Sequence, residues 1–268
     1  MFFISNDFYL NVIKHLVKKN ILDIKMKILI AAAGSADKAR FLEMSFKNVT
    51  ISNFDRRMKA DSFKPFKWSF QDVENLSFKD KSFDFCIIHH GLHHSASPHK
   101  GLIELYRVSK NGILVFEGID NLVSRLGVFL GFSESYELAA VFNNNLKYGG
   151  FRNTGVPNFV YRWTPREILK TVSSIEPFLR PKIKFFYGLE LPFDRLKKMK
   201  NKFYFIFAIL AFPIIFILFF LFHKLIGNRF SFLIQKPNFI KDIHPWLKNK
   251  KGKILPGENF FKKKYSEK

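Results

Sequence analysis

The stretch "SFDFCIIHHGLHHSASPHKGLIELYRVSKNGILVFEG", residues 82–118, decides the fold. An apolar run at 82–89 is followed by a helix-like segment and then by a second apolar run at 111–118. Continuous apolar runs that alternate with helices are typical of parallel strands covered on both faces. Two earlier runs, at 27–32 and 48–54, repeat the pattern. We therefore predict an α/β fold with a doubly wound, Rossmann-like sheet.

The rest of the chain divides around this core. We expect an N-terminal helix within residues 1–24, capped by Asn6 or Asp7, and a cofactor-binding core at 25–120. Residues 121–182 should hold a substrate-recognition insert and a helix that starts at the capping box "TPRE". The last two strands fall within 183–237, and residues 238–268 form a basic C-terminal tail.

A membrane signal lies between the last two predicted strands. Residues 203–222 form an apolar run without a charge, and this run is long enough to span a membrane. Pro213 divides the run, and basic residues crowd both of its ends. Because both flanks must return to one sheet, we predict a bent hydrophobic helical hairpin that dips into one leaflet. A buried pair of core helices is the alternative.

The charge of the chain favours an anionic partner. Its formal net charge is +22, and residues 191–268 carry 17 Lys and Arg against 4 Asp and Glu. This excess lies beside the apolar run, which indicates an anionic membrane surface. No RNA-binding module accompanies it, so we do not expect a nucleic-acid partner. A lysine-rich composition without functional meaning is the alternative reading.

Polar and small residues follow the predicted strands. Gly34 stands after the first strand, where a turn could approach a ligand, although an ordinary strand-to-helix turn would look the same. Asp55 ends the second strand, 21 positions after Gly34, where a carboxylate can accept hydrogen bonds from both ribose hydroxyls of a nucleoside. Asp72 and the backbone of Val73 could contact an adenine.

In this order, the motifs resemble the central block of class I S-adenosylmethionine-dependent methyltransferases of the small-molecule branch. The resemblance rests on "DVE" at 72–74, "SFD" at 82–84, the histidine-rich strand exit and the helix with "ELYRV". It implies S-adenosylmethionine as cofactor, held by Gly34, Asp55, Asp72 and Val73. "NVTISNFD" and Asp37 also resemble a subgroup of these methyltransferases that is associated with surface-polysaccharide synthesis. The resemblance also implies that His89 faces the cofactor.

Five histidines lie within residues 89–99. A zinc site would pair His89 with His93, or His90 with His94, but structural zinc usually needs four ligands, and the surrounding stretch offers one cysteine, Cys86, and no spaced carboxylate set. We therefore expect no metal. The resemblance places the histidines in the cofactor and substrate cleft. His90, His93 and His94 are the candidate catalytic bases for a hydroxyl acceptor; positioning of the acceptor without a base is the alternative for methyl transfer.

The insert contains one candidate acceptor site. Tyr161, Arg162 and Trp163 could hold a sugar by stacking and hydrogen bonding. A structured connection with Trp163 in a small core is the alternative.

These features predict a membrane-associated methyltransferase on the cytoplasmic face of the membrane, a compartment that the single cysteine fits. We expect O-methylation of a glycan or a lipid-linked sugar. Methylation of a membrane quinone precursor is one alternative. A non-catalytic relic of the fold is another, suggested by Ala32 and Ala36 where glycines would strengthen the loop. The sequence indicates no oligomeric state.

Overall fold

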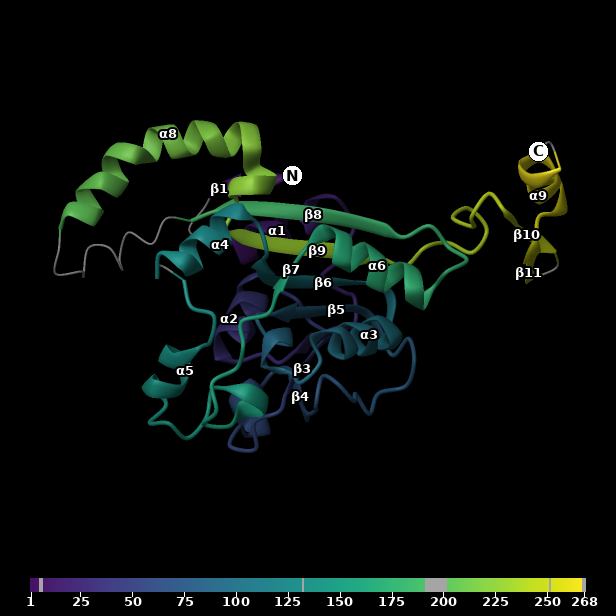
Figure 1. Cartoon of the computed structure of the whole chain (residues 1–268). Helices are drawn as coiled ribbons and strands as arrows, with labels where there is room; N and C mark the ends of the chain where they lie inside the picture. The colour runs from purple at the N-terminus through teal and green to yellow at the C-terminus, as the bar shows by residue number, and fades with distance from the viewer. Residues whose placement is uncertain (5–6, 132, 191–201, 251, 267–268) are drawn as a thin grey trace.

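The computed structural model describes residues 1–4, 7–131, 133–190, 202–250 and 252–266 (Figure 1). Its centre is a nine-stranded sheet. In spatial order the strands are β4 (Lys67–Phe70), β3 (Val49–Asn53), β2 (Ile28–Ala31), β5 (Phe83–His89), β6 (Ser109–Ile119), β9 (Arg229–Gln235), β8 (Lys182–Leu189) and β1 (Phe2–Ile4). The ninth strand, β7 (Arg162–Trp163), pairs with β6. Strands β4 to β6 are parallel, whereas β9 is antiparallel to β6 and β8.

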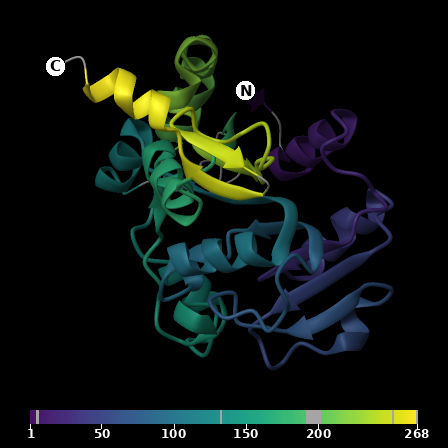
Figure 2. The same ribbon diagram turned by 90° about the vertical axis from the view of Figure 1, so that its right-hand side faces the viewer.

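Helices cover both faces of this sheet (Figure 2). Side chains of α1 (Phe8–Lys18) and α2 (Ser35–Glu43) belong to one apolar core. Side chains of α3 (Pro98–Val108) and α6 (Pro165–Ile175) belong to the other. A strand between two cores must be apolar on both sides, and all four residues of β2 are buried. The predicted doubly wound sheet is confirmed.

The predicted helix caps are also present. The Asp7 side chain accepts a hydrogen bond from the backbone N–H of Leu10 at 2.9 Å and so begins α1. Thr164 and Glu167 form the capping box of α6, with Pro165 as its first residue. Each cap satisfies backbone N–H groups that the first turn of a helix leaves unpaired.

The core also encloses the only thiol of the chain. Cys86, on the central strand β5, has no exposed surface, and burial raises the pKa of its side chain well above the usual range. It forms no disulfide.

The prediction of a helical hairpin was wrong. Residues 203–226 form one helix, α8 (Phe203–Ile226), which continues through Pro213 and departs from helical geometry only at Phe222. A proline removes one backbone donor, and here the helix tolerates that loss. Phe219 is the only buried residue among those of α8 whose side chains are described. Residues 209–226 have a mean hydropathy of 2.5, which makes α8 the one described helix long and apolar enough to cross a membrane.

Shorter elements complete the chain. The predicted basic tail contains a hairpin and a helix, which extend away from the sheet in Figure 1: β10 (Leu247–Lys250), β11 (Lys253–Pro256) and α9 (Glu258–Tyr265). Short helices lie around the carboxyl ends of the parallel strands: η1 (Ala60–Phe63), η2 (Leu92–His94), α4 (Leu122–Phe129), α5 (Leu138–Asn143) and η3 (Phe151–Asn153).

Candidate active site

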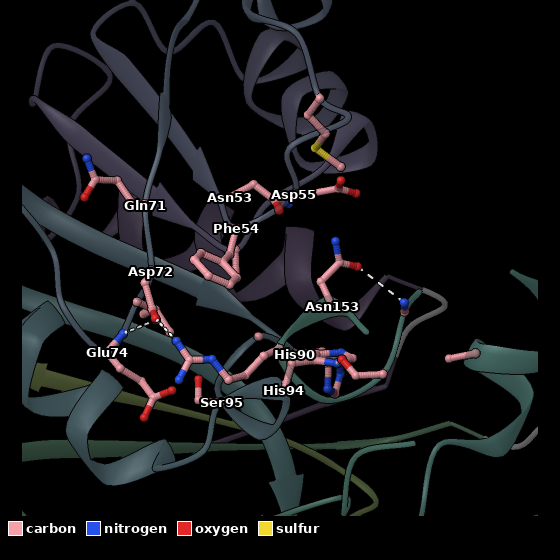
Figure 3. A pocket seen from close by; sticks show the side chains of 18 of the residues that line it. Asn53, Phe54, Asp55, Gln71, Asp72, Glu74, His90, His94, Ser95 and Asn153 are labelled. Atoms are coloured by element: carbon pink, nitrogen blue, oxygen red, sulfur yellow. Dashed lines mark hydrogen bonds and ion pairs between the residues drawn. The ribbon is translucent and has the colours of Figure 1, made fainter. Parts of the chain in front are cut away.

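A cavity of about 390 Å³ opens at the carboxyl ends of β2 to β5, where open α/β sheets bind their ligands (Figure 3). Its volume lies within the range of small-molecule sites. The sheet side contributes Ala32, Asn53, Phe54, Asp55, Asp72, Val73 and His90. The insert contributes Glu137, Ala140, Asn144, Gly149, Gly150, Arg152 and Asn153. Three of the predicted cofactor residues, Asp55, Asp72 and Val73, therefore share one cavity.

Asp55 is buried and already paired. Its Oδ1 accepts hydrogen bonds from the backbone N–H of Arg57 at 2.9 Å and from Arg57 Nε at 2.8 Å, and its Oδ2 accepts one from an Arg57 Nη. These bonds from Arg57 hold the pKa of Asp55 below its usual range. A carboxylate accepts about four hydrogen bonds, so one position remains, for which Asn153 competes. Asp55 can thus accept one ligand hydroxyl as it stands, and a second requires Arg57 to move.

Asp72 joins the sheet side of the cavity to the insert. Its Oδ1 accepts the backbone N–H of Glu74 at 2.9 Å, and its Oδ2 accepts a hydrogen bond from Arg152 at 2.6 Å. Each oxygen therefore keeps one acceptor position. The neighbouring Glu74 carboxylate accepts the backbone N–H groups of Ala96 and Ser97, which fixes the loop before α3.

Two arginine side chains connect the insert to the sheet side of the cavity, Arg57 from the sheet side and Arg152 from the insert. The Arg57 guanidinium lies 3.1 Å from the centre of the Tyr148 ring, and that of Arg152 lies 5.5 Å from the centre of the Phe54 ring. Arg152 has a φ of +46°, a conformation that is rare for a residue with a side chain. The contacts with Asp72 and Phe54 therefore accompany a backbone conformation of Arg152 that a residue with a side chain disfavours.

Gly34, Asp37 and His89 are not among the residues that line this cavity. The backbone N–H of Gly34 donates to Asp37 Oδ2 at 3.0 Å, which begins α2, and Asp37 Oδ1 lies 3.8 Å from His89 Nδ1. His89 instead lines a separate hollow of about 180 Å³ with Tyr9 and Arg40. Burial lowers the pKa of His89 to about 4. These three residues are brought together, but beside the cavity rather than in it.

His93 is held in a buried charge cluster. Its Nδ1 lies 2.5 Å from Oε2 of Glu117, and its Nε2 lies 3.4 Å from Oε1 of Glu137. Burial opposes the charged form of the ring, but the two carboxylates outweigh it and raise the pKa of His93 to about 10. His93 is 4% exposed and does not line the cavity. An imidazolium at neutral pH has no lone pair to accept a proton, so we do not propose His93 as a base.

His90 and His94 do line the cavity. Burial lowers the pKa of His90 to about 4, and burial together with the nearby His93 lowers that of His94. Both rings are therefore neutral at physiological pH. His94 Nδ1 lies 3.3 Å from the carbonyl oxygen of Gly150 and Nε2 lies 3.4 Å from Glu137 Oε2.

The predicted acceptor residues lie elsewhere. Trp163 has no exposed surface and packs in the core between β6 and α6, with its ring 5.9 Å from that of Phe232. The Tyr161 hydroxyl donates to Glu167, and Arg162 donates to Ser133 and to the backbone carbonyl of Glu134. None of the three lines the cavity. In this structure the three residues lie outside the cavity, which is the arrangement expected of a structured connection rather than of a sugar site in the cavity.

Sequence reasoning missed Glu117 and Glu137. Glu117 stands at the end of the apolar strand β6 and is 1% exposed. A carboxylate in such a run must find a partner, because an unpaired buried charge is very costly. The nearby histidines were the available partners, so this signal was present in the sequence. Glu137 lies in a segment without periodicity, and only the folded chain brings it to the cluster.

The sequence profile described as a methyltransferase domain matches residues 29–116, which include β3 to β5 and most of β2 and β6. The chain contains a methyltransferase domain and is an S-adenosylmethionine-dependent methyltransferase. No curated protein matches its sequence.

Solved structures share the fold of this methyltransferase at low sequence identity. The YcgJ protein of Bacillus subtilis is 14% identical, with a TM-score of 0.51 over 85% of this chain and 99% of its own. The Haloferax volcanii methyltransferase structure in complex with the Trm112 activator is 12% identical, with a TM-score of 0.52 over 87% of this chain and 91% of that one. The shared sheet has strand order β4-β3-β2-β5-β6-β9-β8.

The cavity of the methyltransferase fits the cofactor. When bound, S-adenosylmethionine supplies a methyl group activated by its sulfonium sulfur. Asp55 and Asp72 offer the free acceptor positions that hydroxyl and amine donors need. Gly91 forms part of the wall beside Ala32, where a Cβ on Gly91 would lie only 2.5 Å from that of Ala32. A larger residue at Gly91 would therefore clash with Ala32 and displace this part of the wall.

Proposed function

We propose that this methyltransferase O-methylates a glycan or lipid-linked sugar at the cytoplasmic face of the membrane. The observation that carries the proposal is the position of α5. Ala140 and Asn144, on or just after this helix, line the cavity. Leu138 and Phe142, on the same helix, are 59% and 73% exposed. One short element thus joins the cavity to an apolar outer surface.

A second apolar surface lies over α4 and α8, which contact each other (Figure 1). On α4 the exposed residues are Leu122, Leu126 and Phe129, with Leu130 just after it. Most described side chains of α8 are exposed as well. Monomeric soluble proteins rarely leave so many large apolar side chains exposed on two packed helices. A membrane is the partner that covers such a surface without a specific binding groove.

The ends of α8 favour insertion into one leaflet. Its last turn is held at the sheet, since Asn121 donates to the carbonyl of Gly227 at 2.7 Å and Asn228 donates to that of Gly188 at 3.0 Å. If α8 crossed the bilayer, residues 190–202 would have to cross it in the other direction. This connection contains Arg195 and four lysines, at 197, 198, 200 and 202, which are expensive in hydrocarbon. A helix lying within the cytoplasmic leaflet avoids that cost.

His90 is suited to position the acceptor. It lines the cavity, and its neutral ring can accept a hydrogen bond from a hydroxyl. A group whose conjugate acid has a pKa of about 4 is a weak base, and it does not readily remove the proton of a hydroxyl group. We therefore assign it orientation of the acceptor oxygen for in-line attack, which can supply a large part of the rate.

The experiment uses methyl-labelled S-adenosylmethionine and membranes from the source organism. After incubation with the full-length protein, label is followed into glycolipid, quinone and RNA fractions, and the products are hydrolysed. We expect label in the glycolipid fraction that acid releases as an O-methyl sugar. Label in quinones supports the alternative acceptor, and label in RNA contradicts the proposal. If calorimetry detects no cofactor binding, the chain is a relic of the fold.

A further inference from the structure

The charge cluster contains two buried polar atoms without a hydrogen-bond partner, Nε2 of His93 and Oε2 of Glu137. The His93 side chain is only 3% exposed, so bulk solvent hardly reaches it. Nε2 of His94 lies 3.4 Å from the same Glu137 oxygen. Two nitrogens and one carboxylate therefore converge, with their ligand atoms within 4.8 Å of one another. We propose that His93, His94 and Glu137 bind a divalent transition-metal ion.

The spacing of the donors fits such an ion. Zn²⁺ binds imidazole nitrogen and carboxylate oxygen at roughly 2.0–2.1 Å, so two donors of a tetrahedral site lie about 3.3 Å apart. The distances from His93 Nε2 to Glu137 Oε1 and from His94 Nε2 to Glu137 Oε2 are both 3.4 Å, so each nitrogen faces its own oxygen of the same carboxylate. That separation exceeds a good N–H···O hydrogen bond but matches the edge of a coordination tetrahedron. Two histidines and one carboxylate also form a common ligand set for Zn²⁺ and Fe²⁺.

The other ring nitrogens are arranged as they are around metal-binding histidines. His93 Nδ1 faces the buried carboxylate of Glu117, and His94 Nδ1 faces the carbonyl oxygen of Gly150. Metal-binding histidines usually donate their second N–H to a carboxylate or a carbonyl, which directs the remaining lone pair to the ion. With both Nδ1 atoms donating, both Nε2 lone pairs point into the cluster. The ion would replace the proton that His93 Nε2 otherwise holds.

The supporting groups are themselves fixed. Oε1 of Glu117 accepts the backbone N–H of Leu92 at 2.8 Å, which orients the carboxylate toward His93. Gly150 is held by close backbone contact, because a Cβ there would lie 1.9 Å from the carbonyl oxygen of Val156. His90, His93 and Glu117 form a second group of candidate ligands. Glu117 already has a backbone and an imidazole partner, so we assign it the supporting position.

This inference departs from the expectation of no metal, because the sequence did not show that Glu137 joins the histidines. The ion would sit at the cavity wall, since His94 and Glu137 both line the cavity. Three protein ligands leave a position for an oxygen, and a bound divalent ion makes a hydroxyl more acidic. The acceptor oxygen would then form its bond to the methyl carbon as the carbon–sulfur bond breaks, with the hydroxyl proton released to solvent. This role rests on the proposed function, whereas metal binding does not.

The test is metal binding by the full chain after removal of any purification tag and dialysis against chelator. Zn²⁺ is titrated by calorimetry, and Co²⁺ is added separately to report coordination geometry by its visible absorption. We expect one equivalent of each ion and intense tetrahedral Co²⁺ bands. Glu137→Gln and His94→Ala should each weaken Zn²⁺ binding at least tenfold and remove the bands. Glu134→Gln, three residues away and outside the cluster, should change neither.

Circular dichroism shows whether each variant is folded, and the Co²⁺ spectrum of the wild-type protein stands independently of all of them. Failure of the wild-type protein to bind one equivalent of Zn²⁺ or Co²⁺ overturns the proposal. Equal binding by the wild-type protein and folded Glu137→Gln overturns it as well. Because neither readout requires methyl transfer, metal binding can succeed while the proposed acceptor fails, and the reverse.

Discussion

Arg152 and Asp72 are 80 residues apart in sequence, yet the guanidinium of one lies 2.6 Å from a carboxylate oxygen of the other. The pair ties the insert to the loop after β4 at the mouth of the cavity. Both side chains are partly exposed, so the contribution of the pair to overall stability is small. Its effect should appear in ligand exchange instead.

We expect Arg152→Ala to raise the dissociation rate of S-adenosylmethionine about threefold to tenfold, since an ion pair of roughly 1 kcal/mol no longer holds the insert closed. Stopped-flow fluorescence measures the rate. Arg166→Ala, an exposed substitution at the start of α6, is the matched control and should leave it unchanged. Equal rates for the wild-type protein and Arg152→Ala would show that the insert does not retain the cofactor.

Asp55 should determine cofactor affinity. Asp55→Ala removes an acceptor from a buried site and should weaken S-adenosylmethionine binding about tenfold to hundredfold. Calorimetry measures the dissociation constant. Asp61→Ala is the control, because Asp61 forms an exposed ion pair with Lys64. A folded Asp55→Ala variant with wild-type affinity would remove Asp55 from the cofactor site.

Trp163 should matter for stability. Trp163→Ala leaves a cavity in the core beside Phe232, so we expect the free energy of unfolding to fall by roughly 3–5 kcal/mol. Urea denaturation followed by circular dichroism measures it. Trp246→Ala, in the C-terminal segment where Trp246 is 38% exposed, should cost far less. An unchanged unfolding midpoint for Trp163→Ala would return this residue to the acceptor site.

The apolar surface should determine membrane binding. Phe129 on α4 is 83% exposed, and burying one such side chain is worth roughly 1.5–3 kcal/mol. Phe129→Glu should therefore lower partitioning into anionic vesicles by about tenfold or more. Leu169→Glu, on the exposed side of α6, is the control. Vesicle flotation measures both, and high salt alone should not release the wild-type protein. Release of all the protein by high salt would show that charge attraction alone holds it at the membrane.

The fold could be predicted because its central strands are buried on both faces. Burial makes β2 a continuous apolar run, β5 a nearly continuous one and β3 a run rich in β-branched residues, and these patterns are visible without a structure. The edge strand β4 was missed because Lys67–Phe70 is partly exposed and therefore mixed in polarity. The hairpin was predicted from Pro213, the basic flanks and the return of both ends to one sheet, but α8 continues through Pro213 as one helix. Composition alone does not decide whether a helix tolerates a proline.

The site was predictable where a residue follows a strand, and not where it comes from the insert. Asp55 and Asp72 follow β3 and β4, so strand positions alone bring them to one end of the sheet. Arg152 and Glu137 reach the same cavity through a segment of short helices and positive-φ residues, which has no periodic pattern. Trp163 was misplaced for a related reason. An aromatic residue next to an arginine has the same composition in a sugar site and in a core.

Because Cys86 is buried within β5, thiol reagents do not reach the native cysteine in the folded protein. A cysteine introduced at an exposed position of α8, such as Ile214, would be the only thiol that a maleimide spin label can reach in the folded protein. Successive single substitutions along the helix could then be labelled without first replacing the native cysteine. The depth of each label in a bilayer would read out whether α8 lies flat or tilts, one residue at a time.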